Sequence, residues 1–419
     1  MMKKTLLIIS AALVSFQAWS TPDEKQVLIH YADLAYAMYE DSLITAKQLQ
    51  QAVNRLIKQP TEANLKAAKK AWVEARVPYQ QTEAYRFGNA IVDDWEGKVN
   101  AWPLDEGLID YVSASYGKES DENIYYTANV IANPSLMLSG RVIDATKITK
   151  TLLADTLHEV DGIEANVATG YHAIEFLLWG QDLNGAGPGA GARSASDFNT
   201  QICAWGNCDR RARYLEVVTD LLVEELKWMT QQWTTDGEAR KVLLEQDTKS
   251  GLATILTGMG SLSYGELAGE RMKLGLMLHD PEEEHDCFSD NTHWSHYYDA
   301  MGIRNVYTGS YRRIDGSLVK GPSLSDLVAA ADASTDKALR SALDNTQTKM
   351  QTLVDSAMAG KAYDQMIGEN NDRGNRRVMA AIDALLQQTR QIEKAVTSLK
   401  LDAIAFEGSD SLDAPKKVF

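Results

Sequence analysis

Apolar residues recur every three or four positions along most of this chain, and the strict alternation typical of half-buried strands is scarce. The longest pattern covers 24–59 and ends at Pro60, after which Thr61 is placed to cap a second helix. Pro78 should kink or break that second helix. Another strong amphipathic pattern covers 209–233. The sequence therefore predicts an all-α protein.

Two helical bundles account best for the length of the chain. A segment rich in Gly, Ala and Ser, 185–208, separates an expected N-terminal bundle over 21–184 from an expected C-terminal bundle over 209–419. Two further stretches, 88–103 and 280–321, are expected to be mostly loop. The remaining helical patterns are near 145–160, 162–179, 238–278, 324–359 and 373–399.

The start of the chain has the features of a secretory signal peptide, expected over 1–20. Lys3 and Lys4 precede an apolar run at 6–16, and Ala18-Trp19-Ser20 provides a small-x-small cleavage site. The apolar run is too short to span a membrane. We therefore expect a mature protein that is periplasmic, secreted or held at the cell surface.

The chain is strongly acidic, with a formal net charge of −16. A negative field repels phosphate backbones and anionic lipids, which argues against nucleic acid as a partner. The same field makes cations plausible ligands, although solubility alone explains it equally well.

Three cysteines are present, and Cys203 and Cys208 lie close together in CAWGNC. In an exported protein this pair is expected to form a local disulfide. Cys287 is left over, and a buried, inert thiol is the commonest state for such a residue.

The segment GYHAIEFLLWG predicts a helix that is apolar on nearly every face. His172 and Glu175 lie one helical turn apart on it, on the face that also carries Phe176 and Trp179. A buried imidazole and carboxylate must be paired, hydrogen-bonded or bound to a metal. A structural His–Glu hydrogen bond and a metal site both remain open, because HxxE alone is a weak pattern.

A second group of polar residues lies in HDPEEEHDCFSDNTHWSH, which holds four of the seven histidines. The run 282–284 is expected to be a solvated acidic loop. The part 288–293, with Asp290 and His293, could instead cap a helix or line a polar site.

A third group lies earlier in the chain, at the three- and four-residue spacing of a helix. It consists of Trp72, Arg76, Tyr79, Glu83 and Arg86. Glu83 and Arg86 could form a surface pair of little energetic value, or Arg76 and Glu83 could face inward near Pro78. The zincin motif H-E-x-x-H is absent, since His158-Glu159 lacks the second histidine.

Together these segments resemble the imelysin family, in its branch of exported, iron-regulated proteins. The resemblance rests on GYHAIEFLLWGQD with the Gly-rich loop that follows, AWxxARxxYxxTExYRF, NCDRRARYL and FSDNTH…GIRNVYTGSY. It implies two antiparallel helical bundles packed side by side, with a cleft near the GxHxxE helix. It also implies a bacterial periplasmic or outer-membrane setting and a role in iron acquisition.

The resemblance places the motif on Gly170, His172 and Glu175. We expect an iron or zinc ion, or a small iron-bearing ligand, in the cleft between the bundles, and an outer-membrane or periplasmic uptake component as a partner. The expected metal ligands are His172, Glu175 and Glu83. The expected ligand-binding residues are Gly170, Trp72, Arg76, Asp290 and His293.

Two other functions remain open. The family carries a metallopeptidase label from an insulin-cleaving relative, and zinc at His172 and Glu175 with Glu83 as general base would suit hydrolysis. Alternatively, the chain is a helical interaction protein that docks on a surface receptor, and the His–Glu pair is structural.

Overall fold

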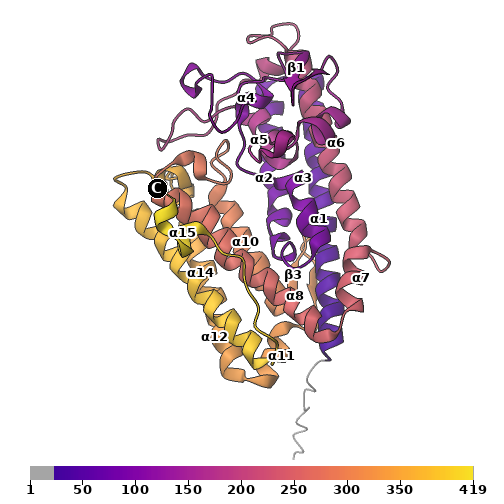
Figure 1. The fold of residues 1–419 in the computed structure, drawn as a ribbon, viewed down its shortest axis with the longest axis vertical. Coiled ribbons are helices and arrows are strands. Elements are labelled where there is room, and N and C mark those ends of the chain that lie inside the picture. Colours follow the sequence, from indigo (N-terminus) through magenta and orange to yellow (C-terminus); the bar gives the residue numbers. More distant parts are fainter. Residues whose placement is uncertain (1–22, 419) are drawn as a thin grey trace, which may run out of the picture.

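The computed structural model describes residues 23–418, so the predicted signal peptide lies outside the described residues. Within this range the protein is mainly helical, which confirms the all-α prediction (Figure 1). None of the described helices combines the length and the apolar character needed to cross a membrane.

The helices form two groups side by side (Figure 1). In the first, α1 packs along α2 and α6, and α5 lies against α2, α3 and α6. In the second, α12 packs between α10 and α14, and α14 also contacts η6. Helices α2 and α10 touch, so they form part of the seam between the groups. The bounds are α1 Glu24–Lys58, α2 Glu62–Gln80, α3 Ala90–Asn100, α5 Gly170–Trp179, α6 Cys208–Gln232, η6 Leu262–Leu274 (π-helical), α10 Thr292–Thr308, α12 Ala333–Met358 and α14 Asp372–Ser398.

Shorter elements complete the fold. Two antiparallel hairpins pair Ser135 with Asp144 and Ser310 with Lys320 at their open ends. The short helices and strands are α4 Glu106–Ile109, α7 Glu238–Glu245, α8 Thr248–Ser261, α9 Gly275–Leu278, α11 Leu324–Ala331, α13 Tyr363–Ile367, α15 Asp410–Asp413, β1 Ser135–Leu138, β2 Arg141–Asp144, β3 Ser310–Arg312 and β4 Leu318–Lys320. Single turns of 3₁₀ or π helix are η1 Glu83–Tyr85, η2 Ala114–Tyr116, η3 Leu152–Leu157, η4 Val160–Gly162, η5 Ala195–Phe198, η7 Pro281–Glu283 and η8 Pro415–Lys417.

The first two helices follow the predicted pattern closely. The side chain of Thr61 accepts a hydrogen bond from the backbone N–H of Asn64 and so caps α2. Pro78 does not break α2, which continues to Gln80 before it ends. The expected Cys203–Cys208 disulfide is present, with the two Cα atoms 5.8 Å apart, and Cys287 is a partly buried free thiol.

Two segments that were expected to be mostly loop contain helices instead, so these predictions are wrong. The stretch 88–103 contains α3, which buries Val92, Trp95 and Val99. The stretch 280–321 contains α10, whose buried face carries polar residues among its apolar ones, so it shows little apolar periodicity. The expected connector 185–208 does not divide the two groups either. Helix α6 follows it and packs on α1 and α5, because the large apolar face of α6 completes the first bundle.

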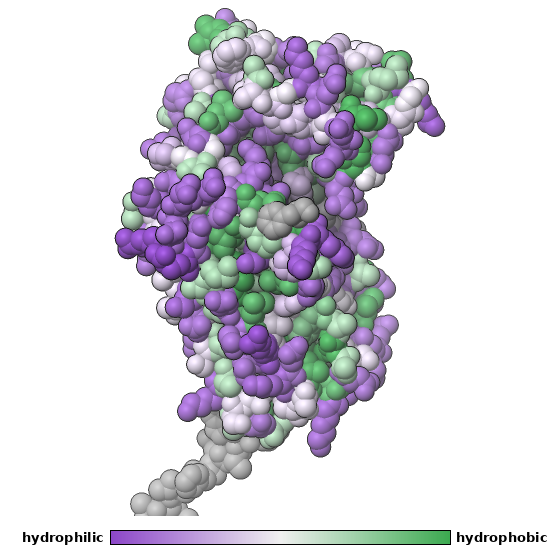
Figure 2. Space-filling model, turned by 60° about the vertical axis from the view of Figure 1, so that its left-hand side comes forward, coloured by the Kyte–Doolittle hydropathy of each residue, from purple (hydrophilic) through white to green (hydrophobic). Residues whose placement is uncertain are grey.

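The outer surface is largely polar. Figure 2 shows hydrophilic residues spread over both groups of helices on the face turned forward, with apolar residues in smaller groups between them. This distribution suits a chain of high net negative charge.

Candidate functional site

Helix α5 is the most enclosed helix of the site, because every residue from Gly170 to Trp179 is buried. Its first residue, Gly170, has a φ of +83°, and a Cβ placed there would lie 2.5 Å from the backbone oxygen of Val99. Only glycine suits this left-handed conformation beside the end of α3 without strain. The contact fixes where the first turn of α5, and with it His172, begins.

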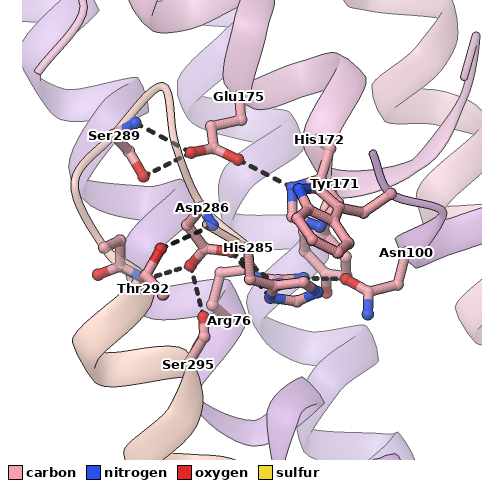
Figure 3. Close-up of polar contacts among 12 residues, drawn as sticks. Arg76, Asn100, Tyr171, His172, Glu175, His285, Asp286, Ser289, Thr292 and Ser295 are labelled. Atoms are coloured by element: carbon pink, nitrogen blue, oxygen red, sulfur yellow. Dashed lines mark hydrogen bonds and ion pairs between the residues drawn. The ribbon is translucent and has the colours of Figure 1, made fainter. Parts of the chain in front are cut away.

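His172 and Glu175 form a hydrogen-bonded pair inside the protein (Figure 3). Nδ1 of His172 lies 3.0 Å from Oε2 of Glu175. The other oxygen, Oε1, accepts hydrogen bonds from the backbone N–H and the hydroxyl of Ser289, at 3.0 and 2.6 Å. Nε2 of His172 is buried and has no hydrogen-bond partner among the described residues. When Nδ1 donates to the carboxylate, the lone pair of Nε2 is free to bind a ligand.

Two residues from the distant loop before α10 meet His172. The rings of His172 and His285 lie edge to face with centroids 4.8 Å apart. One potential ligand atom from each of His172, His285 and Asp286 lies within 4.8 Å of the others, and all three residues are buried. We call these three residues the trio. Two imidazoles and a carboxylate form a donor set that non-haem iron and zinc both accept.

Arg76 holds the trio from the side of α2. Its Nη2 lies 3.0 Å from Oδ1 of Asp286 and 3.3 Å from Nδ1 of His285, and its Nη1 donates to Asn100. Oδ2 of Asp286 accepts from Asn291 and Ser295. The guanidinium therefore balances Asp286 and fixes its orientation.

Burial sets the protonation of these groups. Burial, reinforced by Arg76, lowers the pKa of His172 to about 3, and burial also holds the pKa of His285 well below its usual value. Burial alone would raise the pKa of Asp286, but Arg76 and His285 hold it well below its usual value. Both imidazoles are thus neutral at ordinary pH, the form in which histidine binds metal.

A pocket of about 560 Å³ includes one member of the trio, His285, in its lining. Trp102 also belongs to its lining, together with residues of α3 and η6. Carboxylates outnumber cationic groups in this lining, which would raise the local concentration of cations. Its lining residues are Arg86, Asp93, Asp94, Glu96, Gly97, Asn100, Ala101, Trp102, Pro103, Glu159, Glu164, Glu266, Glu270, Arg271 and His285.

The other residues singled out in the sequence lie around the trio but outside it. Glu83 faces inward, yet its carboxylate is 2.6 Å from Nη2 of Arg271, so it is not among the groups that converge on His172. Trp72 donates to the backbone oxygen of Tyr171 and supports α5. His293 is buried in the first turn of α10, and Asp290 belongs to a different cluster.

That second cluster consists of Glu284, Asp290 and Asp364, and we call it the carboxylate cluster. One oxygen from each residue lies within 4.8 Å of the others. Glu284 is only 1% exposed, so the expectation that 282–284 is entirely solvated is wrong at this position. Burial, together with neighbouring carboxylates, raises the pKa of Asp290 to about 7 and that of Asp364 to about 6.

The sequence model of the imelysin family matches residues 35–392, which is most of the chain. The chain belongs to the imelysin family. This membership confirms the resemblance seen in the sequence. The matched residues include helices of both bundles.

Two relatives bear the same description. Iron-regulated protein A of Synechococcus elongatus is 44% identical over 64 residues, a match that covers 15% of this imelysin and only 18% of the relative. The crystal structure of a protein described as an iron-regulated protein A precursor, from Parabacteroides distasonis, is similar with a TM-score of 0.63. It is 16% identical, and the match covers 91% of this chain and 97% of that one, which shows a shared fold.

Proposed function

We propose that this imelysin is an exported binding protein that captures iron, as the ion or within a small iron-bearing ligand, at the trio of His172, His285 and Asp286. The observation that carries the proposal is the buried, unpartnered Nε2 of His172, a residue that lies beside two further donor groups in the interior. A buried polar atom without a partner is costly unless a ligand satisfies it.

The surroundings of His172 support this assignment. Glu175 is hydrogen-bonded to His172 in the way that a carboxylate holds a metal-bound histidine. Asp286 already balances Arg76, so a bare dication would bring excess positive charge into the interior. An iron complex that carries its own anionic groups would relieve this excess, and Arg76 could contact those groups.

Binding fits the geometry better than hydrolysis. A metallopeptidase needs a carboxylate that is free to activate water. The Glu175 carboxylate is hydrogen-bonded through both oxygens, and Glu83 is held by Arg271. The names of the relatives point to iron, and an uptake component of the periplasm or outer membrane is the partner we propose for its transfer.

Anaerobic calorimetric titration of Fe(II) into chelator-stripped protein tests the site, with Zn(II) titrated in parallel. We expect one site per chain and at least a tenfold weaker affinity in His172→Gln and in His285→Gln. The double variant should lose measurable binding, because only Asp286 remains of the trio.

His293→Gln is the matched control, since it makes the same change at a buried histidine of the same region that lies outside the trio. It should bind Fe(II) like the unmodified protein, and melting curves should verify that each variant is folded. Unchanged affinity in the double variant would remove the site. Chelator-sensitive cleavage across a peptide library would favour hydrolysis instead.

A further inference from the structure

The carboxylate cluster holds three acidic side chains that are largely shielded from solvent. Glu284 and Asp364 are 1% and 0% exposed. Asp364 comes from α13 of the second bundle, whereas Glu284 and Asp290 come from the loop that also carries His285 and Asp286. Asp182, at the start of the Gly-rich segment, adds a fourth negative charge nearby.

Four of the six carboxylate oxygens in this cluster are buried without a hydrogen-bond partner among the described residues. Oε2 of Glu284, Oδ1 of Asp290 and both carboxylate oxygens of Asp364 are buried without a hydrogen bond. Because neither oxygen of Asp364 is paired, the oxygen that faces the cluster is unpaired as well. No Lys or Arg within residues 23–418 forms an ion pair with these three carboxylates.

Such an arrangement calls for a cation. Converging buried carboxylates that lack donors and basic partners repel one another and lose their hydration. Oxygens on opposite sides of a bound Ca²⁺ lie roughly 4.6–5.2 Å apart, twice the usual Ca–O distance. The oxygens of the cluster lie within 4.8 Å of one another, so one ion can contact all three residues, and the all-oxygen donor set suits a hard cation rather than iron or zinc.

We propose that Glu284, Asp290 and Asp364 bind one Ca²⁺ ion, at a site separate from the trio. The ion joins α13 to the loop before α10, and it therefore fixes the loop that presents His285 and Asp286. Three carboxylates leave the occupied site with one negative charge, and they can supply up to six oxygens if all bind through both atoms.

The structure also provides an optical reporter. The indole Nε1 of Trp102 donates to the backbone oxygen of Glu284 at 3.1 Å, so an aromatic ring lies beside the site. Tb³⁺ replaces Ca²⁺ at oxygen sites and emits when a nearby indole transfers its excitation. Tb³⁺ added to chelator-treated protein should emit on excitation of tryptophan, and Ca²⁺ should quench that emission by displacement.

The test compares Asp364→Asn with Glu369→Gln, an isosteric change at an exposed acid close by in the chain. Ca²⁺ should raise the melting temperature of the unmodified protein and of Glu369→Gln. In Asp364→Asn we expect at least a tenfold weaker Ca²⁺ affinity and a higher melting temperature without Ca²⁺, because one repelling charge is gone. Trp102→Phe should lose most of the Tb³⁺ emission yet keep the Ca²⁺-dependent melting shift.

The result that overturns the proposal is a melting temperature of the unmodified protein that does not respond to Ca²⁺. That result would mean that the carboxyl groups share protons instead of a cation. The His172→Gln variant separates the two sites: it should keep its Ca²⁺ response whether or not the trio binds iron.

Discussion

Histidines in this protein are buried to an unusual degree, and several have a ring nitrogen without a partner. Nε2 of His172, Nδ1 of His293 and both nitrogens of His296 are buried and unpaired among the described residues. Burial lowers the pKa of His296 to about 3 and that of His293 to about 4. Each ring is therefore neutral in the folded protein and becomes charged near pH 6.5 once the chain unfolds.

This difference makes the fold sensitive to acid. Between about pH 6.5 and pH 3 the unfolded chain binds a proton at His296 that the folded protein does not, so stability falls as the pH falls through that window. His296→Phe keeps a ring against Tyr363 and removes the titration. We expect its unfolding free energy to lose up to about 1.4 kcal/mol less per pH unit than that of the unmodified protein.

Urea unfolding at a series of pH values from 4.5 to 7.5 measures this slope. His30→Phe, a change at a buried histidine whose ring is hydrogen-bonded to Gly309, serves for comparison. Parallel stability curves for His296→Phe and the unmodified protein would show that His296 is protonated equally in both states.

Some residues of the site could be predicted from the sequence and others could not. His172 and Glu175 were predictable as a pair because helical spacing alone brings them together. Their partners His285 and Asp286 were seen only as part of a polar run, because tertiary packing brings that run to α5 over more than a hundred residues. For Glu83 the sequence left a surface pair and an inward orientation open; it faces inward, and its partner Arg271 lies far away in the sequence.

Among the elements, α5 shows how closely the helices of the first bundle fit. The strong apolar character of this helix predicted its burial, and the amphipathic patterns of α1, α2, α6, α12 and α14 predicted most of the helical core. Helices α3 and α10 were not predicted, for two different reasons. Helix α3 is short, and α10 buries many polar side chains that belong to the site and to the seam.

A substitution at Gly170 tests how closely α5 fits against α3. Gly170→Ala should destabilise the protein by roughly 2–4 kcal/mol, because the positive φ is strained and the new methyl group meets the backbone of Val99. Gly162→Ala is the matched control, since φ there is +72° and nothing lies within 4 Å of the added Cβ. It should cost only about 1–2 kcal/mol, and equal losses in the two variants, measured by denaturant unfolding, would contradict the tight contact.

For the whole molecule, the segment 400–413 ties together elements of the second bundle (Figure 1). It runs back over α8 and η6, where a Cβ on Gly260 would meet the ring of Phe406 at 2.2 Å. A Cβ on Gly269 would meet the side chain of Ser409 at 2.3 Å, and the hydroxyl of Ser411 donates to the Gly269 carbonyl. Because Gly260 on α8 and Gly269 on η6 have no side chains, the segment can pack directly against these helices.

Removal of residues 400–419 should therefore destabilise the second bundle by several kcal/mol, because it exposes the helical surface that Phe406 and Leu412 cover. Removal of 415–419 alone leaves those contacts in place and should have a much smaller effect. Thermal unfolding of both truncated proteins checks this, and an unchanged melting temperature after the longer deletion would show that the segment only rests on the surface.

The position of this covering segment along the chain affects how the protein is made. About 140 residues separate Gly269 from the serines that cover it. At a synthesis rate of about 5–20 residues per second, the bare glycine surface stays open to water for on the order of ten seconds in each nascent chain. During that interval the unfinished bundle presents a groove that other extended chains can enter, and this is the period in which a chaperone would be needed most.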